Sequence, residues 1–173
     1  MKKLKVGDVF TMTPINDESD FKIGFGQIVK INNKSNFIIV VFKQICHNQN
    51  LPSLDKIVGD DILFLGYTMD ALFYHKYWQV IGNVSFNLDK IKLPYYKLGT
   101  PPDMNIVNYK GNMLRKASRY EFDNLEYQTV SAPVRFELAL NAYHKIAGWN
   151  KDDNELLYQK VLESIVIVEA SNL

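Results

Sequence analysis

The segment Phe37–Phe42, with the sequence FIIVVF, is the feature that most restricts how this chain can fold. A run this short cannot span a membrane, which takes about 20 apolar residues in a helix. Its β-branched and aromatic composition is typical of a buried strand. A second strand, Phe21–Ile31, is predicted just before it, and the polar residues Asn32–Asn36 form the hairpin loop between the two.

Three further strands are predicted in the first hundred residues: Val6–Met12, Ile62–Tyr67 and Trp78–Gly82. Between the last two, Asp70–Lys76 is predicted to form a helical turn or an irregular insertion. Glycines 24 and 26 interrupt the second strand of the chain, which usually marks a bulge, a sharp bend or a close approach of two backbones. Long strands bent at glycines favour a small, strongly curved sheet or an SH3-like barrel with an aromatic interior.

The second half of the chain is predicted to be more helical. Residues 88–105 contain three prolines and form an extended crossing segment, followed by a hairpin around Gly111. The strongest helix has Ser131 as its N-cap, Pro133 in its first turn and Gly148 at its end. Two apolar stripes predict that this helix is mostly buried: Val134, Leu138, Ala142 and Ile146, and then Phe136, Leu140 and Ala147.

A second helix is predicted from Asp152 or Asp153 to about Glu163, and Ile165–Val168 is predicted as a last strand. The fold class is therefore α+β, mainly β. We expect a single domain over residues 1–173, with a β-rich, barrel-like part at 1–120 and a helical part at 131–164 packed on it. A hydrophobic share of 47% and a charged share of 23% exclude a disordered chain.

Charge and cysteine content restrict the function classes. The 20 Lys and Arg residues nearly balance 19 Asp and Glu residues, unlike the strongly basic domains that bind phosphate backbones. The only cysteine, Cys46, excludes an internal disulfide and fits a reducing compartment. Polar residues after the first lysines interrupt any signal-peptide core. We therefore expect a cytoplasmic protein without a membrane partner.

Residue patterns that carry catalysis or hold cofactors are scarce. The histidines His47, His75 and His144 lack the spacing that places two metal ligands on one helix face. The glycines of Gly24–Gly26 lack the third glycine of a dinucleotide-binding turn, and there is no phosphate-binding P-loop. We predict no catalytic residue, no cofactor and no metal site.

Three weaker patterns each have a structural explanation. Cys46–His47 could pair a nucleophile with a base, but neighbours in sequence rarely point at one another, and a small apolar side chain at a strand end is the simpler interpretation. Glu137, Asn141 and His144 share a helix face and could form an acid/base stripe, although a solvated face is the preferred interpretation. Asp60–Asp61 could bind a cation, but adjacent acids before a strand are usually exposed turn residues.

One basic segment supports an alternative function. Four basic residues fall within ten positions that contain no acid, and tyrosines 109 and 120 flank them: Lys110, Arg115, Lys116 and Arg119. Basic grooves with stacking aromatic rings bind single-stranded nucleic acid. Three acidic residues follow directly, which is typical of a solvated face with alternating charges. An SH3-like barrel that binds nucleic acid, with Tyr109 and these four residues as its contact patch, therefore stays the disfavoured alternative.

Three segments considered together resemble the Immunity protein 26 family: Val6–Phe10 (VGDVF), Gly24–Val29 (GFGQIV), and Ile62–Phe64 followed by Trp78–Asn83 (WQVIGN). Their order and spacing carry the resemblance, which covers roughly residues 4–95. It implies a bacterial immunity protein of a polymorphic-toxin system, encoded beside a toxin gene. Such a protein is mostly β and neutralises its cognate toxin by binding it, without chemistry of its own.

Two patches are candidates for contact with such a partner. One is an acidic loop with Asp17, Glu18 and Asp20. The other is the segment Phe73–Trp78, whose aromatic side chains follow no clean period. Interface anchors are enriched in Tyr and Trp, although most such residues in a sequence belong to the core. The predicted contact residues of the second patch are Tyr74, Tyr77 and Trp78, with Asp70 as a charge at the rim.

Overall fold

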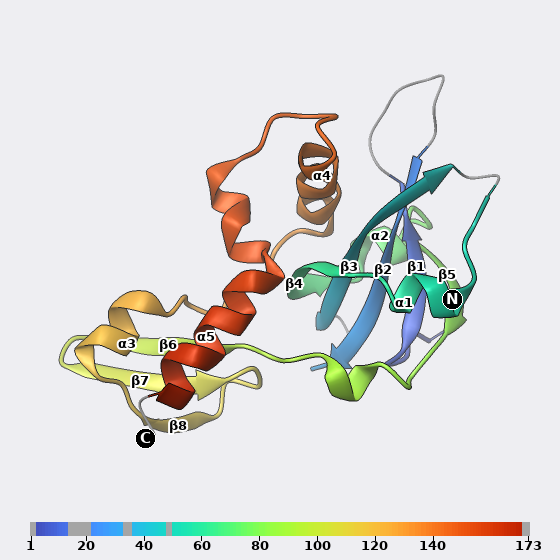
Figure 1. The fold of residues 1–173 in the computed structure, drawn as a ribbon. Coiled ribbons are helices and arrows are strands. Elements are labelled where there is room, and N and C mark those ends of the chain that lie inside the picture. Colours follow the sequence, from blue (N-terminus) through green and yellow to red (C-terminus); the bar gives the residue numbers. More distant parts are fainter. Residues whose placement is uncertain (1–2, 14–21, 33–35, 48–49, 171–173) are drawn as a thin grey trace.

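The computed structural model describes residues 3–13, 22–32, 36–47 and 50–170, which form two antiparallel sheets and several helices (Figure 1). The α+β, mainly β class is confirmed. The first sheet has the strand order β4-β3-β2-β1-β5, with β1 at Asp8–Met12, β2 at Lys22–Ile31, β3 at Asn36–His47, β4 at Ile62–Met69 and β5 at Gln79–Asn83. The second has the order β6-β7-β8, with β6 at Tyr95–Thr100, β7 at Asp103–Asn108 and β8 at Met113–Lys116.

The helices in the described part of the chain are short. They are α1 (Leu54–Val58), α2 (Ala71–Tyr74), α3 (Arg119–Asn124), α4 (Pro133–Tyr143) and α5 (Tyr158–Ala170), with two 3₁₀ turns, η1 (Leu88–Lys90) and η2 (Lys151–Leu156). In the ranges that the structure describes, no helix combines the length and the apolar character needed to cross a membrane.

The first sheet is apolar on both faces, since β1, β2 and β3 carry apolar side chains at successive positions. On one face, α2 and α4 cover a cluster that includes Phe10, Ile39, Phe64, Trp78 and Phe136. On the other face, α1, α5 and the segment after β5 cover a cluster that includes Val9, Phe25, Val40, Ile57 and Val161. The sheet is therefore the middle layer of the chain.

The closed SH3-like barrel that the glycines suggested does not form. The edge strands β4 and β5 lie at opposite ends of the strand order and do not pair with each other. Later segments of the chain bridge to β4 instead, at Phe64–Leu157 and Tyr67–Val130. Because these segments occupy the edge of β4, the sheet stays open.

The sequence left a bulge, a sharp bend or a close approach open at the glycines of β2, and the structure has both a close approach and a bulge-like register shift there. A Cβ atom at Gly26 would lie 2.4 Å from Cζ of Phe10 and 2.9 Å from the carbonyl oxygen of Val40. At Gly24 it would lie 2.3 Å from Cδ2 of Leu140 on α4. The β2–β3 register also shifts between the two glycines. The absence of side chains at these positions lets the ring of Phe10 in β1 lie against β2 and lets Leu140 of α4 pack directly on the sheet.

The second sheet contains one strand, β6, that the sequence did not predict, because the prolines of residues 88–105 indicated an extended crossing segment. The hairpin around Gly111 forms as predicted, between β7 and β8, with φ +80° at the glycine. The crossing segment is shorter than expected, because β6 begins at Tyr95 and pairs with β7. Helices α3 and α5 contact this sheet, and α5 also contacts β4 of the first sheet. Helix α5 therefore connects the two sheets.

The predicted boundaries of α4 are wrong at both ends. Its N-cap is Ala132, because the backbone N–H of Ser131 donates to the carbonyl of Tyr67 in β4. It ends at Tyr143, well before Gly148, because Lys145 adopts φ +61°. The N–H groups of Lys145 and Ile146 then donate to the carbonyls of residues 142 and 141, a Schellman ending in which a lysine takes the usual place of glycine.

The predicted last strand, Ile165–Val168, is wrong, since these residues lie inside α5. The helix also begins later than predicted, because residues 151–156 form η2. Val161, Ile165 and Val168 follow a helical spacing. Val161 and Ile165 pack into the cluster of the first sheet, whereas Val168 packs with Ile106 of β7 and with Leu125, which follows α3. Contact with two sheets accounts for the apolar run at the C-terminal end.

Replacement of Gly26 by alanine tests the close approach to Phe10. We expect Gly26→Ala to lower the free energy of unfolding by about 1–3 kcal/mol, because the added methyl group forces apart β2 and a closely packed ring. Urea denaturation measures the change. The control is Gly148→Ala, where a Cβ atom meets nothing within 4 Å. Equal stabilities of the two variants would contradict the role assigned to Gly26.

Candidate functional site

The aromatic segment that follows β4 is divided between the core and the surface. Phe73 and Trp78 are buried, and their ring centroids lie 5.2 Å apart. Trp78 also stacks on Phe10 at 4.8 Å. The side chains of Tyr74 and Tyr77 are 66% and 62% exposed. Two rings of the segment therefore anchor it, and the other two lie at the surface.

The turn that carries the exposed tyrosines is held by its own backbone. Lys76 adopts φ +62°, a left-handed conformation that is rare for a lysine. The N–H groups of Tyr77 and Trp78 both donate to the carbonyl of Leu72, at 2.9 and 3.1 Å. Backbone strain of this kind persists only when the surroundings enforce it. The positions of Tyr74 and Tyr77 are therefore set before any partner arrives.

The residues predicted to contact a partner differ in how far they are exposed. Tyr74 and Tyr77 are exposed, whereas Trp78 is a core residue that supports them. Asp70 is the N-cap residue of α2 and is partly exposed. The acidic loop with Asp17, Glu18 and Asp20 lies outside the described residues. A role in partner binding stays a prediction for all of these positions.

Helix α4 presents a polar face to the core, contrary to the predicted solvated face. Glu137 and Asn141 are buried, and Oε1 of Glu137 accepts a 2.8 Å hydrogen bond from Nε1 of Trp78. Nε2 of His144 lies 2.7 Å from the carbonyl oxygen of Lys43. This face supplies hydrogen-bond partners to Trp78, just before β5, and to Lys43 in β3. As a consequence Val134 and Leu138, predicted to be core residues, are exposed.

Burial also changes the acidity of two side chains. It raises the pKa of the Glu137 carboxyl, and the Trp78 hydrogen bond opposes that change. Burial likewise raises the pKa of the Cys46 thiol. A nucleophilic cysteine needs the opposite change, since the thiolate is the reactive form. The side chains of Cys46 and His47 also leave β3 on opposite sides, as successive strand residues do.

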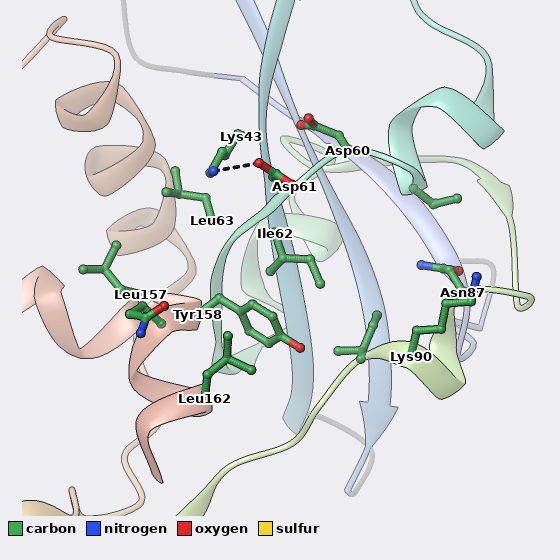
Figure 2. Close-up of a pocket in the computed structure, with 13 residues that line it drawn as sticks. Lys43, Asp60, Asp61, Ile62, Leu63, Asn87, Lys90, Leu157, Tyr158 and Leu162 are labelled. Carbon is green, nitrogen blue, oxygen red and sulfur yellow. Dashed lines mark hydrogen bonds and ion pairs between the residues drawn. The ribbon is translucent and has the colours of Figure 1, made fainter. Parts of the chain in front are cut away.

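A cavity of about 460 Å³ lies between the start of β4, η1 and α5 (Figure 2). Nζ of Lys43 is 2.8 Å from Oδ2 of Asp61, and Oδ2 of Asp60 accepts a 2.7 Å hydrogen bond from the backbone N–H of Gln44. Most of the remaining wall is apolar or aromatic, with Val58, Ile62, Leu63, Ile91, Leu157, Tyr158 and Leu162, and three further polar side chains line it: Asn87, Lys90 and Gln159. Sequence reasoning missed this site, because its walls come from four separated stretches of the chain.

The basic segment of the alternative prediction is largely compensated by acids. Arg115 donates to both carboxylate oxygens of Glu121, at 2.6 and 3.0 Å, and so ties β8 to α3. Further pairs join Lys116 to Asp103 and Arg119 to Asp123, and Nζ of Lys110 lies over the ring of Tyr109. Nucleic-acid binding here stays a prediction, but three of its four cations already have carboxylate partners. Among the described residues no His, Cys, Asp and Glu side chains form a metal-binding group.

Comparison with known proteins identifies the family. The model of the family described as Immunity protein 26 matches residues 5–105, more than half of the chain. This chain belongs to the Immunity protein 26 family. The match includes the whole first sheet, α1, α2 and η1, and leaves α4 and α5 outside it. No curated protein and no solved structure matches the chain.

A pH series on Glu137→Gln tests the buried carboxyl. Because the folded pKa is raised, protonation contributes stability that is complete below the ordinary value of 4.5 and is lost as pH rises through the folded pKa. Glutamine keeps an oxygen for Trp78 and does not titrate. We therefore expect Glu137→Gln to gain stability relative to the natural chain as pH rises from about 4 to about 8.

Urea denaturation at each pH gives these free energies. Glu169→Gln, at an exposed position of α5, makes the same change of charge and is the control. A stability difference between the natural chain and Glu137→Gln that does not vary with pH, or varies as it does for the control, would contradict the assignment.

Proposed function

We propose that this member of the Immunity protein 26 family binds a cognate toxin protein and neutralises it by binding alone. The observation that carries the proposal is the family match over residues 5–105. An immunity-protein family implies a toxin partner and a role without catalysis. We place the protein in the cytoplasm, where its single cysteine stays reduced.

The hydrogen-bond partners and the burial of the candidate catalytic side chains support a binding role. Glu137 accepts the hydrogen bond of Trp78, and His144 contacts a backbone carbonyl of β3. Cys46 has a raised pKa, which keeps its thiol protonated. Glu137 and His144 therefore hold the fold together, and their hydrogen-bond partners limit the chemistry that these two groups could perform.

We propose that Tyr74 and Tyr77 contact the toxin, with Asp70 at the rim. Large exposed tyrosines on a turn with a fixed backbone lose little conformational entropy on binding, which favours affinity. Trp78 has an indirect role, since its stacking on Phe10 and its hydrogen bond to Glu137 hold the turn in place. The alternative, a nucleic-acid patch at Tyr109–Arg119, has less support because its charges are compensated.

The proposal is tested with the toxin encoded beside the gene for this chain. Mixing the two proteins should give a stable complex in size-exclusion chromatography and remove the toxin's activity. We expect Tyr74→Ala combined with Tyr77→Ala to weaken binding at least about ten-fold, since anchor tyrosines at interfaces carry much of the affinity. Isothermal titration calorimetry measures the loss.

The control is Tyr120→Ala. Tyr120 is as exposed as the two tyrosines of the turn, but it lies on α3, beside the second sheet. No complex with the natural chain would reject the proposed function. A complex that tolerates the double variant and the control equally would keep the function and reject the tyrosine surface.

A further inference from the structure

The cavity of Figure 2 has the size and mixed chemistry of a recognition pocket. Its volume of about 460 Å³ falls within the range of sites that take a side chain or a small ligand. Ile62, Ile91 and Leu162 provide apolar walls. The hydroxyl of Tyr158 accepts a 2.8 Å hydrogen bond from the backbone N–H of Lys92, so the phenol ring is fixed against the wall.

Charge in the cavity is arranged unevenly. Asp60 and Asp61 line it beside Lys43, whereas Lys90 lies with Asn87 on another side (Figure 2). Lys43 and Asp61 form a hydrogen-bonded ion pair, and the hydrogen bond to Asp61 raises the pKa of Lys43. Oδ2 of Asp60 accepts a hydrogen bond from the backbone N–H of Gln44, and Lys43, which is ion-paired with Asp61, also attracts the Asp60 carboxylate, so this side of the cavity holds two carboxylates and one ammonium group. The acidic side of the cavity can therefore accept one more positive charge.

The walls of the cavity divide along the limits of the family match. The lining residues between positions 43 and 91 lie within the matched span 5–105, whereas Leu157 and the α5 residues Tyr158, Gln159 and Leu162 lie outside it. The matched part thus supplies the acidic floor, and a part of this chain beyond the match supplies the opposite wall.

We infer that this cavity receives a long basic side chain, arginine or lysine, that projects from the toxin. The inference rests on the proposed function. The aliphatic stem of such a side chain packs along Ile62 and Leu162, and its charge lies beside Asp60. A single local contact of this kind needs no strong opposite charge on the whole protein, which agrees with the net charge of +1.

Three variants test the inference against the toxin encoded beside the gene. Asp60→Asn keeps an oxygen for the backbone of Gln44 and should weaken binding at least about ten-fold. Gln159→Trp fills the cavity from the exposed side of α5 and should weaken binding to a similar degree. Lys90→Gln should leave affinity unchanged or increase it, because it removes a charge that repels the incoming cation.

Two control variants lie outside the cavity: Asp123→Asn on α3, and Val166→Trp, which adds the same bulk to another side of α5. Both should bind the toxin as the natural chain does, and thermal unfolding checks that every variant folds. If Lys90→Gln weakens binding while Asp60→Asn does not, the occupant is acidic and the inference is overturned. Full affinity of Asp60→Asn and Gln159→Trp also overturns it and leaves the proposed function standing. No binding by the natural chain rejects both.

Discussion

Burial of both faces of one sheet is the constraint on which the rest of this structure depends. Strands β1, β2 and β3 carry apolar side chains in both directions, so neither face can be left in water. Helices α2 and α4 cover one face, and α1 and α5 cover the other. Gly24 lets Leu140 of α4 approach the sheet directly, and Gly26 lets the ring of Phe10 in β1 lie against β2, which makes the α4 side a close-packed layer.

The candidate contact surface is a consequence of this packing. Trp78 fills the layer between the sheet and α4, where its indole N–H needs a partner, and Glu137 supplies one. Because the turn before Trp78 is fixed at its C-terminal end by this burial and at Leu72 by backbone hydrogen bonds, Tyr74 and Tyr77 have to face outward. The same interaction thus stabilises the core and presents the two tyrosines.

Helix α5 links the family-matched part of the chain to the part beyond it. It contacts both sheets, and it forms one wall of the cavity whose floor comes from β4 and the segment before it. The bidentate pair of Arg115 with Glu121 and its bond to the carbonyl of Val168 hold the end of this helix against the second sheet. Its position, and therefore the shape of the cavity, depends on residues far from the acidic side chains that line it.

By itself the sequence determined the strands of the first sheet, the hairpin at Gly111 and the family, because alternation, glycine and turn residues act over a few neighbours. It also marked the aromatic segment, but not which of its rings are buried. Only the tertiary structure decided four features: which face of α4 is exposed, the helical state of Ile165–Val168, the failure of the first sheet to close into a barrel, and the cavity. Each depends on a partner distant in sequence, as Glu137 depends on Trp78.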